Sequence, residues 1–152
     1  MSRLNIKPLS GCIGAEIHGI DLTKPITHEL YIQLRECLVE YEVIFFRDQA
    51  ITPAQQYALA SMFGPLQSHP AYQTVEGFPE ISILESTADK PTKIECWHSD
   101  MTFRQHPPLA TVLRAQVVPD KGGDTLWASM TAAYRGLSKS MQDFLSTLTA
   151  VH

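Results

Sequence analysis

The sequence of 152 residues lacks features that would each mark a particular class of protein. It has no apolar run near the roughly 20 residues that a membrane-spanning helix requires. It also has no block of like charges, and its twelve basic and sixteen acidic residues give a net charge of −4. Proteins that bind nucleic acids generally carry a basic stripe that neutralises phosphates. We therefore expect neither a nucleic acid nor a membrane as a partner.

Cysteine is scarce, and Cys12, Cys37 and Cys96 lie far apart in the chain. No CxxC pair occurs, so neither a disulfide framework nor a zinc ribbon is indicated. Free cysteines behave as small hydrophobic residues and are typical of a reducing compartment. The N-terminus lacks the apolar stretch and the small-residue cleavage site of a secretory signal. These absences predict a soluble cytoplasmic protein.

The length and the 44% of hydrophobic residues suit one compact domain, and no repeat or Gly/Ser linker divides the chain. Extended segments and helices alternate along it. Apolar periodicity and capping residues predict helices that start after Thr27, after Thr52 and after Ser138. Apolar or alternating runs predict strands at residues 4–9, 14–20, 43–46, 81–84, 109–118 and 124–128, with the run at 43–46 fully buried.

His98 stands two residues before Asp100 in the segment WHSDMTF, residues 97–103. Side chains at positions i and i+2 of a strand project from one face, so on a strand the imidazole and the carboxylate would lie together. A second histidine from elsewhere would complete the two-histidine, one-carboxylate triad of non-haem iron(II) oxygenases. By itself the pair also fits a structural His–Asp hydrogen bond. His106 lies in a predicted turn and is not assigned as a ligand.

The wider pattern resembles the taurine/α-ketoglutarate dioxygenase family over essentially all 152 residues. The segments that carry the resemblance follow one another in order: GAEI at 14–17, GIDL at 19–22, VIFFRDQ at 43–49, FG at 63–64, HP at 69–70, WHSDMTF at 97–103, PP at 107–108 and GGDTLW at 122–127. The resemblance implies an α+β or mainly β fold whose core is a jelly roll, the double-stranded β-helix, with flanking helices. It also implies Fe(II), α-ketoglutarate and O2 as cofactor and co-substrates.

The resemblance further implies roles for six residues, position by position. They are iron ligation by His98 and Asp100, binding of α-ketoglutarate by Thr125, and contact with the substrate by His69, Tyr72 and Phe103. The implied substrate is a small anionic molecule, and the full-length protein is expected to form a homo-oligomer.

The chain departs from the family pattern in two places. The second histidine ligand and the arginine that pairs with α-ketoglutarate lie beyond His152 in the family, so residues 1–152 are expected to be the N-terminal part of one dioxygenase domain. Such a piece should bind iron weakly and expose apolar sheet edges. Position 94 is isoleucine where taurine enzymes have an asparagine that contacts the substrate amine. Ile94 cannot make that hydrogen bond, which leaves another sulfonate, a sulfate ester or a different small acid as the substrate.

The implied reaction hydroxylates a small organic sulfonate such as taurine, which then releases sulfite, while α-ketoglutarate is converted to succinate and CO2. The protein would position the substrate and exclude water. Two other functions stay open at this point. One is a metal-dependent hydrolase in which His98 and Asp100 bind zinc and activate water. The other is a non-catalytic fragment that keeps strand pairings without a complete iron site.

Overall fold

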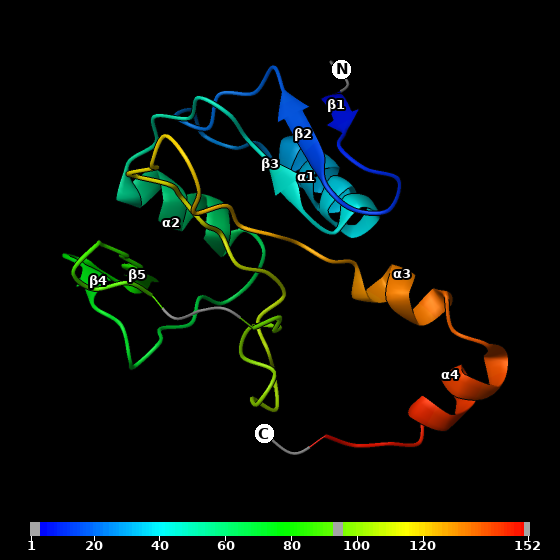
Figure 1. Cartoon of the computed structure of the whole chain (residues 1–152). Helices are drawn as coiled ribbons and strands as arrows, with labels where there is room; N and C mark the ends of the chain where they lie inside the picture. Colours follow the sequence, from blue (N-terminus) through cyan, green and yellow to red (C-terminus); the bar gives the residue numbers. More distant parts are fainter. Residues whose placement is uncertain (1–3, 93–95, 151–152) are drawn as a thin grey trace. The chain divides into compact units, whose positions relative to one another are not determined.

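The computed structural model describes residues 4–92 and 96–150, which form two compact units. The first unit contains residues 4–50 and 115–150, and the second contains residues 51–92 and 96–114. Each unit is described by itself below (Figure 1). In this described part of the chain, no helix has both the length and the apolar character needed to cross a membrane.

The first unit is built on a three-stranded sheet of order β1-β2-β3 (Figure 1). Strands β1 (Asn5–Pro8) and β2 (Ala15–His18) pair antiparallel, with Ile6 opposite Ile17. Strand β3 (Ile44–Phe45) pairs parallel with β2. All three lie inside segments that the sequence predicts to be strands. The prediction that the third segment is fully buried is wrong, because β3 is an edge strand and both its residues are only half-buried.

Helix α1 (His28–Tyr41) supplies two of the five buried apolar residues of this unit. The hydroxyl of Thr27 accepts a hydrogen bond from the backbone N–H of Leu30 and caps the helix, as the sequence predicts. Leu34 and Cys37 are buried on the helix face that turns inward. Burial raises the pKa of the Cys37 thiol, with the neighbouring glutamates as a smaller cause. Ala15, Ile17 and Leu22 complete the buried set.

Polar side chains close the end of the sheet. Arg47 donates from Nε to Oε1 of Glu16 at 2.9 Å, and this hydrogen bond is the main reason why the pKa of Glu16 lies below its ordinary value. The amide of Gln49 accepts from the N–H of Leu22 at 2.8 Å and donates to the carbonyl oxygen of Ile20 at 3.2 Å. The VIFFRDQ segment therefore has a structural role in this chain.

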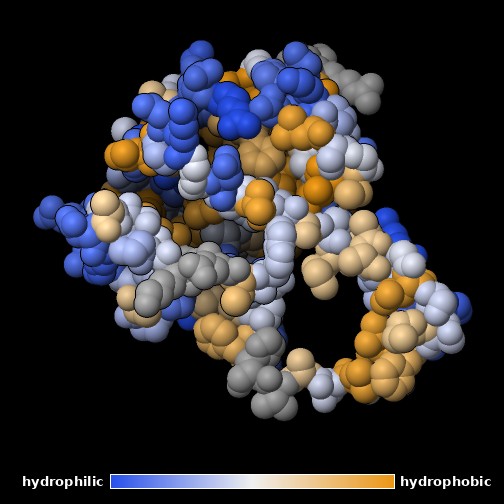
Figure 2. Space-filling view, viewed as in Figure 1, coloured by the Kyte–Doolittle hydropathy of each residue, from blue (hydrophilic) through white to orange (hydrophobic). Residues whose placement is uncertain are grey.

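Two short helices, α3 (Met130–Arg135) and α4 (Lys139–Leu145), also belong to the first unit. Helix α4 begins after Ser138, as predicted, whereas α3 is not predicted from the sequence. The buried hydroxyl of Ser129, which caps α3, donates to Oε1 of Glu42 at 3.0 Å. The surface over α3 and α4 is rich in apolar side chains (Figure 2), and the exposed ones include Met130, Tyr134, Met141, Phe144 and Leu145.

The second unit contains helix α2 (Pro53–Ser61) and a hairpin of β4 (Thr74–Val75) and β5 (Phe78–Ser82). The predicted capping box is confirmed, since the Thr52 hydroxyl accepts from the N–H of Gln55 and the Gln55 side chain accepts from the N–H of Thr52. Helix α2 packs on β5. The aromatic rings of Tyr57 in the helix and Phe78 in the strand are in contact, with their centroids 5.9 Å apart.

Three predicted strands do not form in the described part of the chain. Residues 109–118 and 124–128 have no regular structure, residues 97–99 are likewise irregular, and residues 100–103 form a turn. Their apolar composition favours a strand, but a strand also needs a neighbouring backbone with which to exchange hydrogen bonds. The described strand pairings leave these segments without such a partner. The prediction that a strand carries His98 and Asp100 is therefore wrong.

Candidate metal centre

His98 and Asp100 meet in the second unit although their backbone is irregular. The Nε2 atom of His98 lies 3.3 Å from Oδ1 of Asp100. Each side chain is 55% exposed, so solvent and small molecules reach the pair. Asp100 begins a turn that continues through Met101, whose φ of 57° lies in the left-handed region that non-glycine residues seldom adopt. The turn, rather than strand alternation, brings the imidazole and the carboxylate together.

A second contact sets the orientation of the imidazole. The Nδ1 atom of His98 lies 2.9 Å from the backbone oxygen of Cys96. A carbonyl oxygen only accepts hydrogen bonds, so Nδ1 must carry the proton in this contact. In the neutral ring, Nε2 then keeps its lone pair and directs it at the Asp100 carboxylate. A cation between the two atoms, either a proton or a metal ion, would remove the repulsion between their lone pairs.

The carboxylate of Asp100 is held in a similar way. The hydroxyl of Thr111 donates to Oδ2 of Asp100 at 3.2 Å, which leaves Oδ1 directed at His98. In metal sites, a hydrogen bond to the ligand atom that does not bind the metal commonly fixes the orientation of that ligand. Sequence reasoning does not find Thr111, because the two residues are eleven positions apart and meet only through the intervening turn.

The residues present fit a divalent metal ion. Two ligands at about 2.1 Å from one ion and about 90° apart are separated by about 3.0 Å. The observed separation of 3.3 Å between Nε2 and Oδ1 is close to this value. One imidazole nitrogen and one carboxylate oxygen are also two of the three donors in an iron(II) facial triad. Within residues 4–92 and 96–150, no group of three His, Cys, Asp or Glu side chains could hold a metal ion.

His69 and Tyr72, which the sequence predicts at the substrate, lie side by side in the same unit. Their ring centroids are 4.7 Å apart and their planes are tilted by 46°. The Nδ1 atom of His69 accepts a hydrogen bond from the N–H of Ala71 at 3.2 Å. The neutral ring therefore carries its proton on Nε2, so that this nitrogen is a hydrogen-bond donor. Together with the Tyr72 hydroxyl, it makes a pair of donors suited to an anion.

Arg104 connects the loop of His69 to the loop of the metal ligands. Its Nη1 donates to Oε1 of Gln67 at 2.7 Å, and its Nη2 donates to the backbone oxygen of Ser68 at 3.3 Å. The N–H of Arg104 donates to the carbonyl oxygen of Met101 at 3.0 Å and closes the turn that follows Asp100. Sequence reasoning misses Arg104 and Gln67, since nothing in either segment indicates that they meet.

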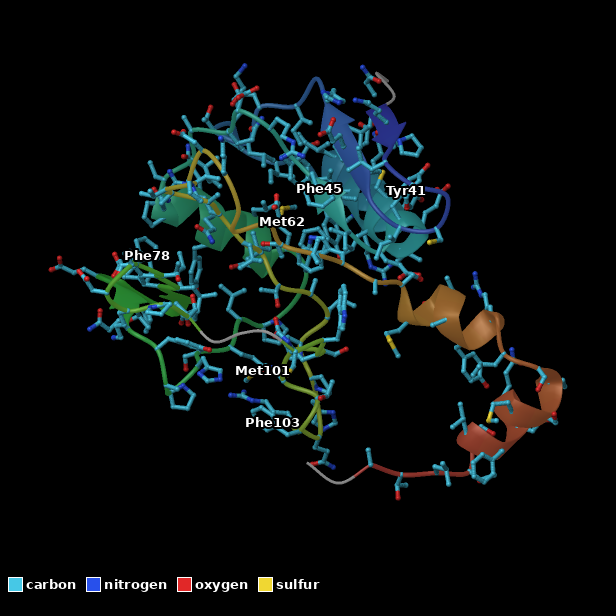
Figure 3. The ribbon with its side chains drawn as sticks, viewed as in Figure 1. Tyr41, Phe45, Met62, Phe78, Met101 and Phe103 are labelled. Atoms are coloured by element: carbon cyan, nitrogen blue, oxygen red, sulfur yellow. The ribbon has the colours of Figure 1, made fainter. Side chains whose placement is uncertain are left out.

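The remaining predicted site residues are not brought to the pair by any described contact. Phe103 lies on the same loop as Met101 (Figure 3), and its side chain is 62% exposed. Thr125 is exposed in the first unit, shortly after Gly122 and Gly123, which have positive φ values of 76° and 73°. Ile94 lies outside the described residues.

A cavity of about 540 Å³ lies in the first unit. The β1–β2 loop, the end of α1 and helix α3 surround it, and Cys12, Glu40 and Arg135 are among its lining residues. None of the predicted site residues lines this cavity. Cys12 and Cys96 are exposed free thiols, and Cys37 is a buried one.

Two curated relatives match nearly the whole chain. An alkylsulfatase of Acinetobacter baylyi is 34% identical over 99% of the chain and 47% of the relative. An α-ketoglutarate-dependent sulfate ester dioxygenase of Pseudomonas putida is 34% identical over 98% of the chain and 49% of the relative. The chain thus spans about half the length of the curated relatives it matches.

Solved structures show the same relationship. A taurine dioxygenase from Burkholderia xenovorans superposes with a TM-score of 0.82 at 37% identity, covering 95% of this chain and 51% of that one. A structure of AAD-2 in complex with Mn(II) and N-oxalylglycine superposes with a TM-score of 0.67 at 28% identity, covering 93% and 48%. The family model described as taurine catabolism dioxygenase TauD, TfdA family, matches residues 5–152. The chain belongs to the TauD/TfdA family of dioxygenases.

Proposed function

We propose that the full-length protein is an iron(II)- and α-ketoglutarate-dependent dioxygenase that hydroxylates a small organic sulfonate. The observation that carries this proposal is the convergence of His98 Nε2 and Asp100 Oδ1, each with its other polar atom already hydrogen-bonded. In the whole protein these residues would belong to one dioxygenase domain with a jelly-roll core. Membership of the TauD/TfdA family supports this architecture.

His98 and Asp100 would hold the iron through Nε2 and Oδ1, and Cys96 and Thr111 would keep both ligands in position. When bound, iron and α-ketoglutarate supply the activation of O2 that oxidises a C–H bond. We assign to the Thr125 hydroxyl a hydrogen bond to a carboxylate oxygen of α-ketoglutarate. The solved relative that contains Mn(II) and N-oxalylglycine supports a metal and a small dicarboxylate as the occupants of such a site.

The substrate is proposed to be anionic because His69 and Tyr72 present two neutral donors side by side. Hydrogen bonds from such groups match the oxygens of a sulfonate, and Phe103 would contact the apolar part of the molecule. An apolar residue at position 94 favours a substrate without an amine. A buried ammonium without a hydrogen-bond partner would cost about 1–3 kcal/mol or more. We therefore expect short alkanesulfonates to be preferred over taurine.

Sulfate esters are a second candidate class of substrate. The observation that favours them is the match to an alkylsulfatase and to a sulfate ester dioxygenase over nearly the whole chain. A sulfate ester presents to His69 and Tyr72 the same three terminal oxygens as a sulfonate. Hydroxylation of the carbon next to the ester oxygen would release sulfate and an aldehyde, whereas hydroxylation of a sulfonate would release sulfite. The two classes are therefore separated by the sulfur product.

The test measures both sulfur products from the full-length protein with iron(II), α-ketoglutarate and O2. The panel contains taurine, butanesulfonate, pentanesulfonate and hexyl sulfate, and kcat/KM is compared across it. We expect succinate formation that depends on one of the amine-free anions and is lost in His98→Ala. His106→Ala is the matched control, because the His106 ring is not assigned to the metal.

Four results would contradict the proposal. Turnover without α-ketoglutarate would indicate a metal-dependent hydrolase. Sulfate release alone would move the function to the second candidate class, and a clear preference for taurine would show that another residue contacts the amine. Retention of full activity in His98→Ala would remove the metal assignment itself.

A further inference from the structure

Arg104 links two loops of the second unit to which the proposed function gives different tasks. One loop carries His69, which would contact the substrate anion, and the other carries Asp100, which would bind iron. The Arg104 guanidinium donates to the side chain of Gln67 at 2.7 Å and to the backbone oxygen of Ser68 at 3.3 Å. It therefore holds the first loop at two points immediately before His69.

The backbone of Arg104 is held in place as well. The backbone N–H of Arg104 is bonded to the carbonyl oxygen of Met101, so the arginine rises from the same tight turn that positions Asp100. Gln67 makes a further bond in the opposite direction, from its Nε2 to the backbone oxygen of His106 at 3.4 Å. Three hydrogen bonds thus join residues 67–68 to residues 104–106, and a change in either loop is transmitted to the other.

The type of side chain matters here. Arginine presents several N–H groups in a rigid plane, which allows one side chain to satisfy an amide oxygen and a carbonyl oxygen together. Hydrogen bonds from a charged donor are stronger than those between neutral groups. Arg104 is half-buried, and its partners in the described part of the chain are neutral oxygens rather than carboxylates. Its positive charge is therefore available to favour an anion near His69.

We propose that Arg104 is a positioning residue that sets the distance between the substrate anion and the iron. It acts through Gln67 and Ser68 and does not touch the reacting atoms. This inference rests on the proposed function, and it adds a determinant of substrate alignment outside the residues that bind substrate or metal. Misalignment in such a site shows itself as uncoupling, in which α-ketoglutarate is consumed without hydroxylated product.

The test compares the full-length wild-type protein with Arg104→Met and with the control Lys90→Met. Lys90 is a cation of the same unit for which the structure gives backbone hydrogen bonds only. In Arg104→Met we expect KM for the anionic substrate to rise about tenfold, because the loop of His69 loses its charge-assisted hydrogen bond to Arg104. The yield of product per succinate should fall, while KM for α-ketoglutarate stays at the wild-type value. Lys90→Met should match the wild type in all three quantities.

A combined variant tests whether the link itself is responsible. Arg104→Lys alone loses the planar fork, whereas Arg104→Lys together with Gln67→Glu recreates one charge-assisted contact. The pair should recover part of the coupling that Arg104→Lys loses. These variants also keep the test valid if Arg104→Met fails to fold, and thermal melting identifies that case.

Amide hydrogen exchange of the metal-free protein gives a readout that does not depend on turnover. Peptides that cover residues 66–72 should exchange faster in Arg104→Met than in the wild type or in Lys90→Met. A wild-type protein without α-ketoglutarate-dependent turnover would overturn the proposed function, while the exchange result would still decide whether the link exists. Unchanged exchange, or a uniform loss of kcat with wild-type KM and full coupling, would overturn the inference.

Discussion

The core around Leu34 and the loop around His98 are held by different forces. Leu34 is 1% exposed, and Ala15 and Ile17 of the sheet are buried as well, so that region depends on apolar burial. His98 and Asp100 are more than half exposed, and two directed hydrogen bonds hold them instead, one from His98 to the backbone oxygen of Cys96 and one from Thr111 to Asp100. The first region stabilises the fold, whereas the hydrogen bonds of the second orient the lone pairs of His98 Nε2 and Asp100 Oδ1. Mutations in the two regions should accordingly change different measurable quantities.

The largest expected effect on stability is in the core. Leu34→Ala should lower the free energy of unfolding of the 152-residue chain by about 2–5 kcal/mol, because it leaves a cavity in a fully buried site. Leu109→Ala is the matched control, since Leu109 is 64% exposed beside the loop and should change stability by about 0.5 kcal/mol or less. Urea unfolding followed by circular dichroism measures both. An equal loss of unfolding free energy in the two variants would contradict the view that apolar burial stabilises the core more than the exposed loop.

The next effect concerns α-ketoglutarate. Thr125→Val in the full-length protein keeps the side-chain volume but removes the hydroxyl that we assign to the co-substrate. Loss of a hydrogen bond to a charged group costs about 1.5–3 kcal/mol, so KM for α-ketoglutarate should rise roughly ten- to a hundredfold. Thermal stability should not change, because Thr125 is exposed. An unchanged KM would exclude Thr125 from the site.

A smaller effect is expected where Thr111 holds Asp100. Thr111→Val removes the hydrogen bond to Oδ2, and changes at such outer partners weaken metal binding by about 10-fold or more. Isothermal titration with Mn(II) measures the affinity of the full-length protein. Thr92→Val is the control, since the hydrogen bond that Thr92 makes to the hydroxyl of Ser86 comes from its backbone N–H, which valine keeps. Identical affinities in the two variants would show that the carboxylate needs no support from Thr111.

The smallest effect is a pH dependence in the first unit. Arg47 lowers the pKa of Glu16, so the folded state binds fewer protons than the unfolded state in the range below the ordinary glutamate pKa. The contribution of Glu16 is therefore present above that pKa and is lost as the pH falls through the lowered value. Arg47→Gln should reduce the rise of stability across this range, as measured by urea unfolding at a series of acidic pH values. Parallel pH profiles for the two proteins would contradict the assignment.

Local signals were enough to predict the helices and strands of the first 61 residues. Thr27 and the Thr52 capping box act through side chains three residues away, and such contacts are readable from the sequence. The sequence also predicted that the side chains of His98 and Asp100 lie together, although on a strand rather than on a turn. The sequence does not predict the turn at Met101, since a positive φ at a methionine runs against its intrinsic preference.

Most of the features that were not predicted from the sequence are contacts between distant segments. Arg104 meets Gln67 across 37 positions, and Ser129 meets Glu42 across 87, with no local pattern at either end. The apolar runs at 109–118 and 124–128 were predicted as strands because propensity was the only information available. Strand formation also depends on a partner backbone, which composition does not reveal.

Metal binding by the full-length protein is the most direct test of the central claim, that His98 and Asp100 are two of the three protein ligands of an iron site. Anaerobic titration with Fe(II), and with Mn(II) followed by electron paramagnetic resonance, should give one bound ion per chain. His98→Ala and Asp100→Ala should each abolish saturable binding, while His106→Ala should bind as the wild type does. Equal affinity in the wild type, His98→Ala and Asp100→Ala would contradict the account, because it would place the metal on other residues.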